Sequence, residues 1–189
     1  YFIEAVKKTL EDCGIPEVEC VSASLAEALY LVDAETRDRI SVIVDVGYIT
    51  TTFSIIQGDG IMYQESFSFG GGYITAALLD RFNVSYDVAE SLKRKINLSC
   101  TTSSIGTDTI EGDNGEFYPV VEIVSVVKNV LDGLCEDINA AFEKSGYVIP
   151  DYVPLLITGG GISYVRGAKE HLSSRLGIAV DVVAPKVPL

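Results

Sequence analysis

Residues 40–69 read ISVIVDVGYITTTFSIIQGDGIMYQESFSF, a run of three strand-like segments joined by two short turns. The first segment, 40–46, is almost entirely apolar and β-branched, which is typical of a strand buried on both faces. The second and third segments, 51–57 and 61–69, alternate at least in part between apolar and polar residues. Because the connections are so short, we expect the three strands to form an antiparallel meander.

Helical and strand-like segments alternate on both sides of this meander. In the helical segments apolar residues recur at steps of three and four, and Ser24 with Glu27 forms a capping box at the start of one of them. We expect helices at 2–13, 25–32, 74–82, 85–95, 119–144 and 164–176, and further strands at 18–21, 153–157 and 178–183.

The order of these elements indicates an α/β fold. A meander followed by helix, strand, helix and strand is the ribonuclease H-like order. Residues 96–118 interrupt it, because they are rich in Ser, Thr, Gly and Asp and contain a hairpin signal, Asp-Asn-Gly, at 113–115. We therefore expect a larger subdomain made of residues 1–85 and 153–189, with a smaller α+β lobe, residues 86–152, inserted into it.

The composition excludes several classes of protein. Among 189 residues, 14 are Lys or Arg and 27 are Asp or Glu, so the formal net charge is −13. This charge repels phosphate backbones and argues against nucleic-acid binding. Four cysteines without a C-x-x-C pair and one histidine cannot supply a Cys/His zinc site. The chain starts at Tyr1 in what reads as the middle of a helix, so we expect a fragment of a longer protein.

The turn after the first strand of the meander is a candidate ligand site. Asp45 ends a buried strand, Gly47 permits a tight turn, and Thr50 and Thr51 open the next strand. Backbone N–H groups and hydroxyls in such a loop can face a phosphate, and a strand-end carboxylate can reach a hydrated Mg²⁺ ion. The alternative interpretation is an ordinary turn between two strands.

Two glycine runs and one helical pair are further candidates. Residues 70–72 and 159–161 are each Gly-Gly-Gly at a strand-to-helix junction, where the backbone can approach a ligand closely. Glu90 and Lys93 are three residues apart and share one face of a helix. Taken singly, these features are also consistent with tight turns and a surface ion pair.

Motifs for several other chemistries are missing from the sequence. It has neither the G-x-G-x-x-G dinucleotide fingerprint nor the G-K-[ST] of a P-loop. The single histidine, His171, gives no basis for a Ser/His/Asp triad. We name no catalytic residue.

In their order along the chain, the candidate motifs resemble those of the actin-like ATPases, and most closely the bacterial cell-division FtsA family. The series is Asp-x-Gly-x-x-Thr-Thr before a hairpin, Gly-Gly with Ile-Thr, Ala-Glu-x-x-Lys on a helix, and Thr-Gly-Gly-Gly-Ile after a strand. The resemblance covers almost the whole chain and is to the second half of that two-part fold.

The resemblance implies a role for each motif in binding ATP and Mg²⁺. Asp45 would lie near Mg²⁺ and the residues after it near the phosphates. Glu90 and Lys93 would contact the ribose and base, above the glycines of the last turn. The residues assigned to the cofactor site in this way are Asp45, Gly47, Thr50, Thr51, Gly70, Gly71, Glu90, Lys93, Gly159, Gly160 and Gly161.

The resemblance also implies what the whole protein does. Members of the FtsA family bind ATP, polymerise, act with other division proteins at the septum, and link the FtsZ ring to the inner face of the cell membrane. We expect a cytoplasmic body whose membrane contact, a C-terminal amphipathic helix, lies outside this chain. The surface that faces FtsZ would lie in the smaller lobe, residues 86–152.

Four positions depart from the FtsA pattern. Tyr48 and Ile49 stand where glycines are usual, Thr52 where Asp is usual, and Ala77 where Asp is common. We therefore expect ATP hydrolysis to be weak or absent. We also expect the chain alone to bind ATP weakly or not at all, because the first phosphate loop belongs to the other half of the fold. Alternatives with the same fold are a PilM-type pilus-assembly scaffold, an ethanolamine-utilisation protein, and half of a sugar or acetate kinase.

Overall fold

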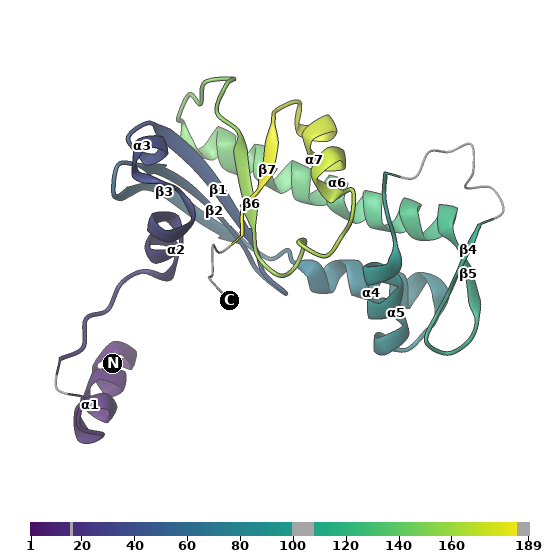
Figure 1. Cartoon of the computed structure of the whole chain (residues 1–189), viewed down its shortest axis with the longest axis horizontal. Helices are drawn as coiled ribbons and strands as arrows, with labels where there is room; N and C mark the ends of the chain where they lie inside the picture. The colour runs from purple at the N-terminus through teal and green to yellow at the C-terminus, as the bar shows by residue number, and fades with distance from the viewer. Residues whose placement is uncertain (16, 100–107, 185–189) are drawn as a thin grey trace.

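A five-stranded sheet forms the centre of the molecule (Figure 1). The computed structural model describes residues 1–15, 17–99 and 108–184. The strands of the sheet are β1 (Ile40–Val46), β2 (Thr51–Gln57), β3 (Gly60–Phe67), β6 (Leu155–Thr158) and β7 (Val180–Val182). Their order is β3-β2-β1-β6-β7, so β1 lies at the centre.

The pairing of the strands confirms the predicted meander. β1 pairs antiparallel with β2, and β2 pairs antiparallel with β3. On its other side β1 pairs in parallel with β6, which pairs in parallel with β7. Parallel pairing brings the carboxyl ends of β1 and β6 to the same edge of the sheet, and this edge carries the candidate site.

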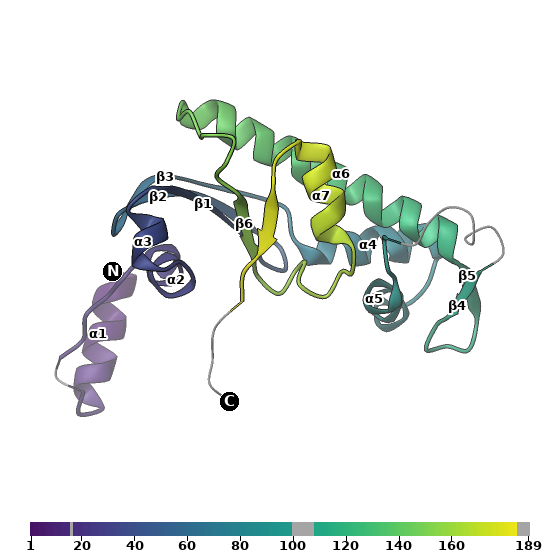
Figure 2. The same cartoon turned by 45° about the horizontal axis from the view of Figure 1, so that its top comes forward.

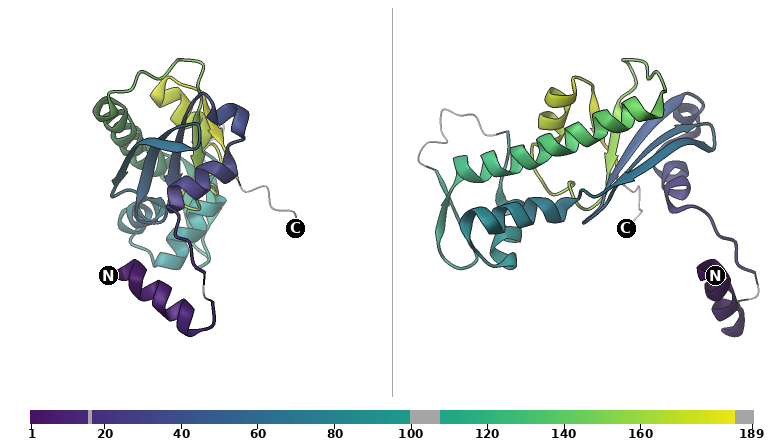
Figure 3. Two further views of the ribbon diagram at one scale, coloured as in Figure 1. Left: turned by 90° about the vertical axis from the view of Figure 1, so that its left-hand side faces the viewer. Right: turned by 180° about the vertical axis from the view of Figure 1, so that it is seen from behind.

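Helices pack against both faces of the sheet, α2 against one and α6 against the other. The described helices are α1 (Phe2–Asp12), α2 (Ala23–Leu31), α3 (Ala34–Arg37), α4 (Gly71–Phe82), α5 (Tyr86–Lys95), α6 (Val120–Ser145) and α7 (Ala168–Leu176). Helix α1 lies apart from the sheet (Figure 1). The 26-residue helix α6 runs along the long axis of the molecule, from the sheet to a small hairpin (Figures 1 and 3). That hairpin consists of β4 (Thr109–Glu111) and β5 (Phe117–Pro119), which confirms the turn expected at 113–115.

The core is divided between the two faces of β1. Val42 and Val44 belong to the main cluster, which also includes Leu131 and Leu134 of α6. Ile43 points to the opposite face and belongs to a smaller cluster with Ala28 of α2. Because both faces of β1 are covered, its nearly continuous apolar sequence is explained.

Two predicted elements near the N-terminus differ in the structure. The predicted strand at 18–21 has no regular structure, because a strand needs a neighbour to pair with and none of the described strands lies beside it. Helix α2 begins at Ala23 with Ser22 as its N-cap, so the predicted capping box at Ser24 is wrong. The Ser24 hydroxyl accepts a hydrogen bond from the side-chain amide of Gln64 instead.

The last helix is shorter than predicted. It begins at Ala168 rather than at 164, because Gly167 before it has a φ of +84°, a left-handed conformation that glycine adopts without strain. A methyl group on Gly167 would also stand 2.7 Å from the main-chain nitrogen of Ser99. Residues 159–165 therefore form a long turn after the end of β6, and the pocket described below opens beside this turn.

Helix α5 and the β4–β5 hairpin lie toward the end of α6 that is remote from the sheet (Figure 2). Residues 100–107 of the predicted insert lie outside the described residues. The proposed division into residues 1–85 with 153–189 and residues 86–152 stays a prediction. Among the described helices, none combines the length and apolar character needed to cross a bilayer.

Candidate functional site

Two glycine turns meet at the carboxyl edge of the sheet. Asp45 of β1 lies beside Thr158 of β6 in the parallel register, so the turns that follow these residues emerge next to each other. The main-chain N–H of Gly161 donates to the carbonyl oxygen of Val46 across 2.8 Å. A methyl group on Gly161 would collide with the carbonyl oxygen of Gly47, so the two turns touch through backbone alone.

The third glycine turn joins the same point. The N–H of Gly71, at the start of α4, donates to the carbonyl oxygen of Gly47 across 2.9 Å. A methyl group on Gly71 would stand 2.5 Å from the carbonyl oxygen of Gly161. Gly70 approaches the carbonyl oxygen of Tyr48 closely in the same way. Turns as far apart in the chain as Gly47 and Gly161 are thus brought together, and each contact requires glycine.

The two threonines after the first turn differ in their surroundings. Thr51 is fully buried, and its hydroxyl donates to the carbonyl oxygen of Phe69 across 2.9 Å. That hydroxyl therefore holds the end of β3 against β2. Thr50 is exposed, and its carbonyl oxygen accepts a hydrogen bond from the N–H of Gly47, which closes the turn.

Two carboxylates lie near the junction of the turns. Burial raises the pKa of Asp45, whose side chain reaches Gly159 of the neighbouring turn. Burial and the nearby Asp45 raise the pKa of Glu27, on α2, to about 7. A divalent cation would lower the pKa values of both carboxyl groups by offsetting their negative charge. In nucleotide sites Mg²⁺ is held by one or two carboxylates together with phosphates and water. No cluster of three or more possible metal ligands occurs among the described residues, so phosphate and water would have to complete the coordination of an ion held by Asp45 and Glu27.

Glu90 and Lys93 form a partly buried ion pair rather than a surface one. The Lys93 ammonium is 2.7 Å from Glu90 Oε2, and their side chains are 6% and 19% exposed. The same ammonium donates to the hydroxyl of Thr75 and to the carbonyl oxygen of Gly71. Burial raises the pKa of Glu90, but hydrogen bonds from Lys93, Thr75 and Arg94 outweigh it, so the net shift is downward. The carboxylate is thus held ionised beside the glycine turns.

A pocket of about 300 Å³ opens between this ion pair and the last glycine turn. Glu90, Lys93, Gly160 and Gly161, all assigned to the cofactor site from the sequence, line it. Three aromatic rings and a guanidinium complete the lining, from Tyr48, Tyr86, Tyr164 and Arg94. The Arg94 guanidinium lies over the Tyr164 ring, 5.6 Å from its centroid. Aromatic faces, polar groups and close backbone are typical of a small-molecule site.

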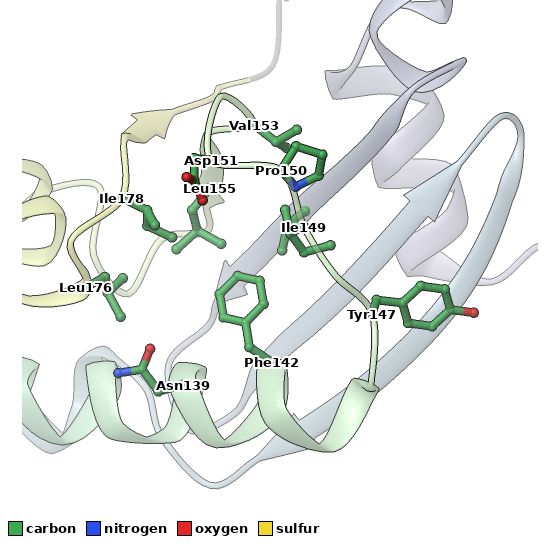
Figure 4. Close-up of a pocket in the computed structure, with 11 residues that line it drawn as sticks. Asn139, Phe142, Tyr147, Ile149, Pro150, Asp151, Val153, Leu155, Leu176 and Ile178 are labelled. Atoms are coloured by element: carbon green, nitrogen blue, oxygen red, sulfur yellow. The ribbon is translucent and has the colours of Figure 1, made fainter.

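Another cavity, of about 290 Å³, lies at the opposite end of the strands (Figure 4). Val42, Leu155 and Phe142 line it, together with residues of the loop after α6. Its walls are mostly apolar. It is remote from the glycine turns because Leu155 begins β6 and Val42 lies beside it in the first half of β1, whereas the turns follow the ends of these strands. It therefore takes no part in the candidate site.

Sequence reasoning missed several residues of the site. In the sequence, Glu27 fits the capping-box pattern that begins at Ser24, and the three tyrosines of the pocket belong to no recognised motif. Tyr86 is the first residue of α5, a position that nothing in the sequence marks as part of a site. Thr75 could have been found from its position, because it lies one helical turn after Gly71 and therefore on the same side of α4.

A curated protein resembles this chain over nearly its whole length. The FtsA protein of Neisseria meningitidis is 22% identical over 190 residues, which are 97% of this chain and 46% of that protein. The chain thus spans about half the length of this curated relative.

Two solved structures show the same fold. MreB 5 of Spiroplasma citri, bound to AMPPNP, superposes with a TM-score of 0.74 at 18% identity, over 95% of this chain and 58% of that one. The PilM–PilN type IV pilus biogenesis complex gives 0.61 at 23% identity, over 96% of this chain and 48% of that one. The fold is therefore that of the actin-like ATPases, as the motif order predicted.

A family model assigns the chain more closely. The model for the type IV pilus assembly protein PilM matches residues 7–104, just over half of the chain. These residues include the meander, the glycine turns at Gly47 and at 70–72, and the Glu90–Lys93 pair. The chain belongs to the PilM family.

Proposed function

We propose that this chain is the half of an actin-like scaffold protein that contacts the nucleoside of ATP. The observation that carries the proposal is the pocket between the Glu90–Lys93 pair and Gly160–Gly161. It combines a carboxylate able to accept hydrogen bonds from ribose hydroxyls with aromatic faces on which a base can stack. Similarity in fold to a protein bound to AMPPNP supports an adenine nucleotide as the ligand.

Asp45 and Glu27 would hold Mg²⁺ beside the phosphates. The ion would neutralise phosphate charge and orient the polyphosphate chain when it is bound. The residues of this chain contribute position and charge. We expect hydrolysis to be weak or absent, because Tyr48 and Ile49 stand in the phosphate turn where glycines are usual in the FtsA family.

The scaffold role has two candidate settings. Membership of the PilM family supports assembly of a type IV pilus, with a PilN-like partner. Similarity to FtsA over almost the whole chain supports a cytoplasmic body that self-assembles and tethers the FtsZ ring to the membrane. We favour the pilus setting, because the family model covers the part of the chain that carries the phosphate turn.

Direct titration tests the nucleotide proposal. Adenosine and Mg²⁺-ATP are added in large excess to the ¹⁵N-labelled 189-residue chain, because we expect this half of the fold to bind weakly by itself, and shifts of the Gly160 and Gly161 amides are followed. Glu90→Gln should weaken binding of both ligands about tenfold, since a charged hydrogen-bond acceptor is lost. Glu170→Gln, an exposed change on α7, is the control. Unchanged binding in Glu90→Gln would place the ligand elsewhere.

The two settings are separated by partner binding. Purified PilN and a C-terminal peptide of FtsZ are each passed over the immobilised chain. Binding of PilN alone supports the pilus role, and binding of the FtsZ peptide alone supports the division role. Binding of neither would count against both.

A further inference from the structure

The ammonium group of Lys93 has no N–H group left to offer a ligand. It has three N–H groups, and three acceptors of this chain surround it: Glu90 Oε2 at 2.7 Å, Thr75 Oγ1 at 2.9 Å and the carbonyl oxygen of Gly71 at 3.2 Å. The Lys93 side chain is nearly fully buried. Its N–H groups are therefore engaged within the protein, although Lys93 borders the pocket.

The hydroxyl of Thr75 links this ammonium group to the carboxylate of Glu90. Thr75 Oγ1 lies 2.7 Å from Glu90 Oε2 and 3.2 Å from the carbonyl oxygen of Gly71. Because a hydroxyl has one proton, we assign that proton to the closer and charged acceptor, Glu90. Thr75 is buried in the second turn of α4, so the carboxylate on α5 is tied to the helix that begins at the junction of the glycine turns.

The two oxygens of the Glu90 carboxylate differ in what they can still accept. Oε2 accepts hydrogen bonds from both Lys93 and Thr75, which occupy its two lone-pair positions. Oε1 accepts one bond, from Arg94 Nε at 3.2 Å, and so keeps one position for a further donor. Because Arg94 lines the pocket, Oε1 is the oxygen on the side of the ligand.

We propose that Thr75 is a positioning residue: its hydroxyl, together with the Lys93 ammonium group, fixes the Glu90 carboxylate so that Oε1 faces the ligand. The inference rests on the proposed nucleotide site. A glutamate side chain rotates about several bonds, and a ligand binds more tightly when that rotation is already restricted. Lys93, which the resemblance to FtsA assigns to the nucleoside, then serves the same carboxylate. Thr75 itself is buried and is not among the residues that line the pocket.

Two substitutions of Thr75 test this role. AMP is added in large excess to the 189-residue wild-type chain, Thr75→Val and Thr75→Ser, and the pKa of Glu90 is measured in each by carboxyl NMR titration. Thr75→Val keeps the shape but loses the hydroxyl, so AMP affinity should fall about fivefold, and the pKa of Glu90 should rise because its charged form loses a donor. Thr75→Ser keeps the hydroxyl and should bring AMP affinity to within about twofold of wild type.

Ser41→Ala is the matched control for loss of stability. The Ser41 hydroxyl is also buried and donates to the carbonyl oxygen of Thr36 across 3.2 Å, but it lies near the start of β1, remote from the glycine turns. Its removal should lower stability while AMP affinity and the pKa of Glu90 stay as in wild type. An equal loss of AMP affinity in Ser41→Ala and Thr75→Val would mean that destabilisation alone weakens binding, and would overturn the inference.

A double variant shows whether Thr75 acts through Glu90. In Glu90→Ala the carboxylate is gone, so adding Thr75→Val should change AMP affinity by less than about twofold. A larger further loss, or a folded Thr75→Val with the AMP affinity and Glu90 pKa of wild type, would overturn the inference while the proposed nucleotide site stands. If AMP binds to neither wild type nor any variant, the nucleotide site itself is wrong and Thr75 has no ligand to serve.

Discussion

Gly71 and Gly161 lie in contact, although ninety residues separate them in the chain: a methyl group on Gly71 would stand 2.5 Å from the carbonyl oxygen of Gly161. The contact joins the start of α4 to the turn after β6. Through Gly47, which accepts a hydrogen bond from Gly71, it also joins the turn after β1. The candidate site therefore depends on three segments that approach at backbone distance.

Substitution of Gly161 should separate these segments. In Gly161→Ala the new methyl group meets main-chain atoms of Gly47, Val46 and Gly71, which cannot rotate away. We expect a loss of about 2 kcal/mol in the free energy of unfolding, typical of overpacking, together with loss of nucleotide binding. Urea denaturation measures the first effect and ligand titration the second.

The neighbouring glycine provides the control. A methyl group on Gly160 has no described atom within 4 Å. Gly160→Ala should therefore stay within about 0.5 kcal/mol of wild type. Equal losses in the two variants would show that the close approach at Gly161 is not what stabilises the site.

Removal of the Lys93 ammonium should destabilise the site through Glu90. In Lys93→Met the apolar stem is kept, but the partly buried Glu90 carboxylate loses its closest cation. We expect a cost of about 3 kcal/mol, the low end for a broken buried pair, because Arg94 remains bonded to Glu90. The pKa of Glu90 should rise, since burial persists after its main opposing partner is gone. Denaturation and carboxyl NMR titration measure the two effects.

A double variant checks the cause of this loss. In Glu90→Gln with Lys93→Met no charge is left unpaired, so part of the stability should return. If the double variant is less stable than Lys93→Met by the full cost of a second independent substitution, the two side chains are not coupled.

Glu27 should make stability depend on pH near neutrality. Its pKa of about 7 in the folded chain lies above its ordinary value of 4.5, so the folded state holds a proton that the unfolded state has released. The resulting stabilisation is complete below pH 4.5 and is lost as pH rises through 7. Glu27→Gln should abolish this part of the pH dependence, as measured by urea denaturation at pH 5, 6, 7 and 8.

An exposed carboxylate supplies the comparison for Glu27. Glu11, on α1, is exposed, and Glu11→Gln should leave the pH profile as in wild type. An identical profile in Glu27→Gln and wild type would contradict the assignment of the proton to Glu27.

Two glycines of α6 should respond in opposite directions to the same substitution. Gly146 ends the helix at a φ of +67°, where alanine is strained by about 1–2 kcal/mol. Gly133 lies inside the helix with open space around it, so alanine should stabilise the chain by up to about 1 kcal/mol. Thermal denaturation of Gly146→Ala and Gly133→Ala measures both, and a shift of the same sign in the two would refute the assigned helix end.

The sequence sufficed for those parts of the fold that depend on local patterns. Residues 40–69 specify the meander through burial and turn length, and Gly146 ends α6 through its backbone conformation. The strand predicted at 18–21 failed because strand formation depends on a partner that a local pattern does not reveal. The start of α7 was predicted too early for a related reason, because the conformation of Gly167 is fixed by its contact with the distant Ser99.

The candidate site shows the same limit. The glycine turns and the Glu90–Lys93 pair could be predicted, because small residues at strand ends and charges at helical spacing leave a recognisable pattern. The hydrogen bond between Tyr48 and Tyr86 could not, because two tyrosines 38 residues apart carry no signal until the fold brings their hydroxyls together.

The central claim is that the pocket between Glu90, Lys93 and the last glycine turn binds the nucleoside of an adenine nucleotide. Amide chemical shifts of the 189-residue chain, recorded while adenosine is added, test it most directly. The account predicts saturable shifts centred on Gly160, Gly161 and Lys93, with little change at Tyr147 beside the apolar cavity. Shifts confined to the region of Tyr147, or no saturable shift at any described residue, would contradict it.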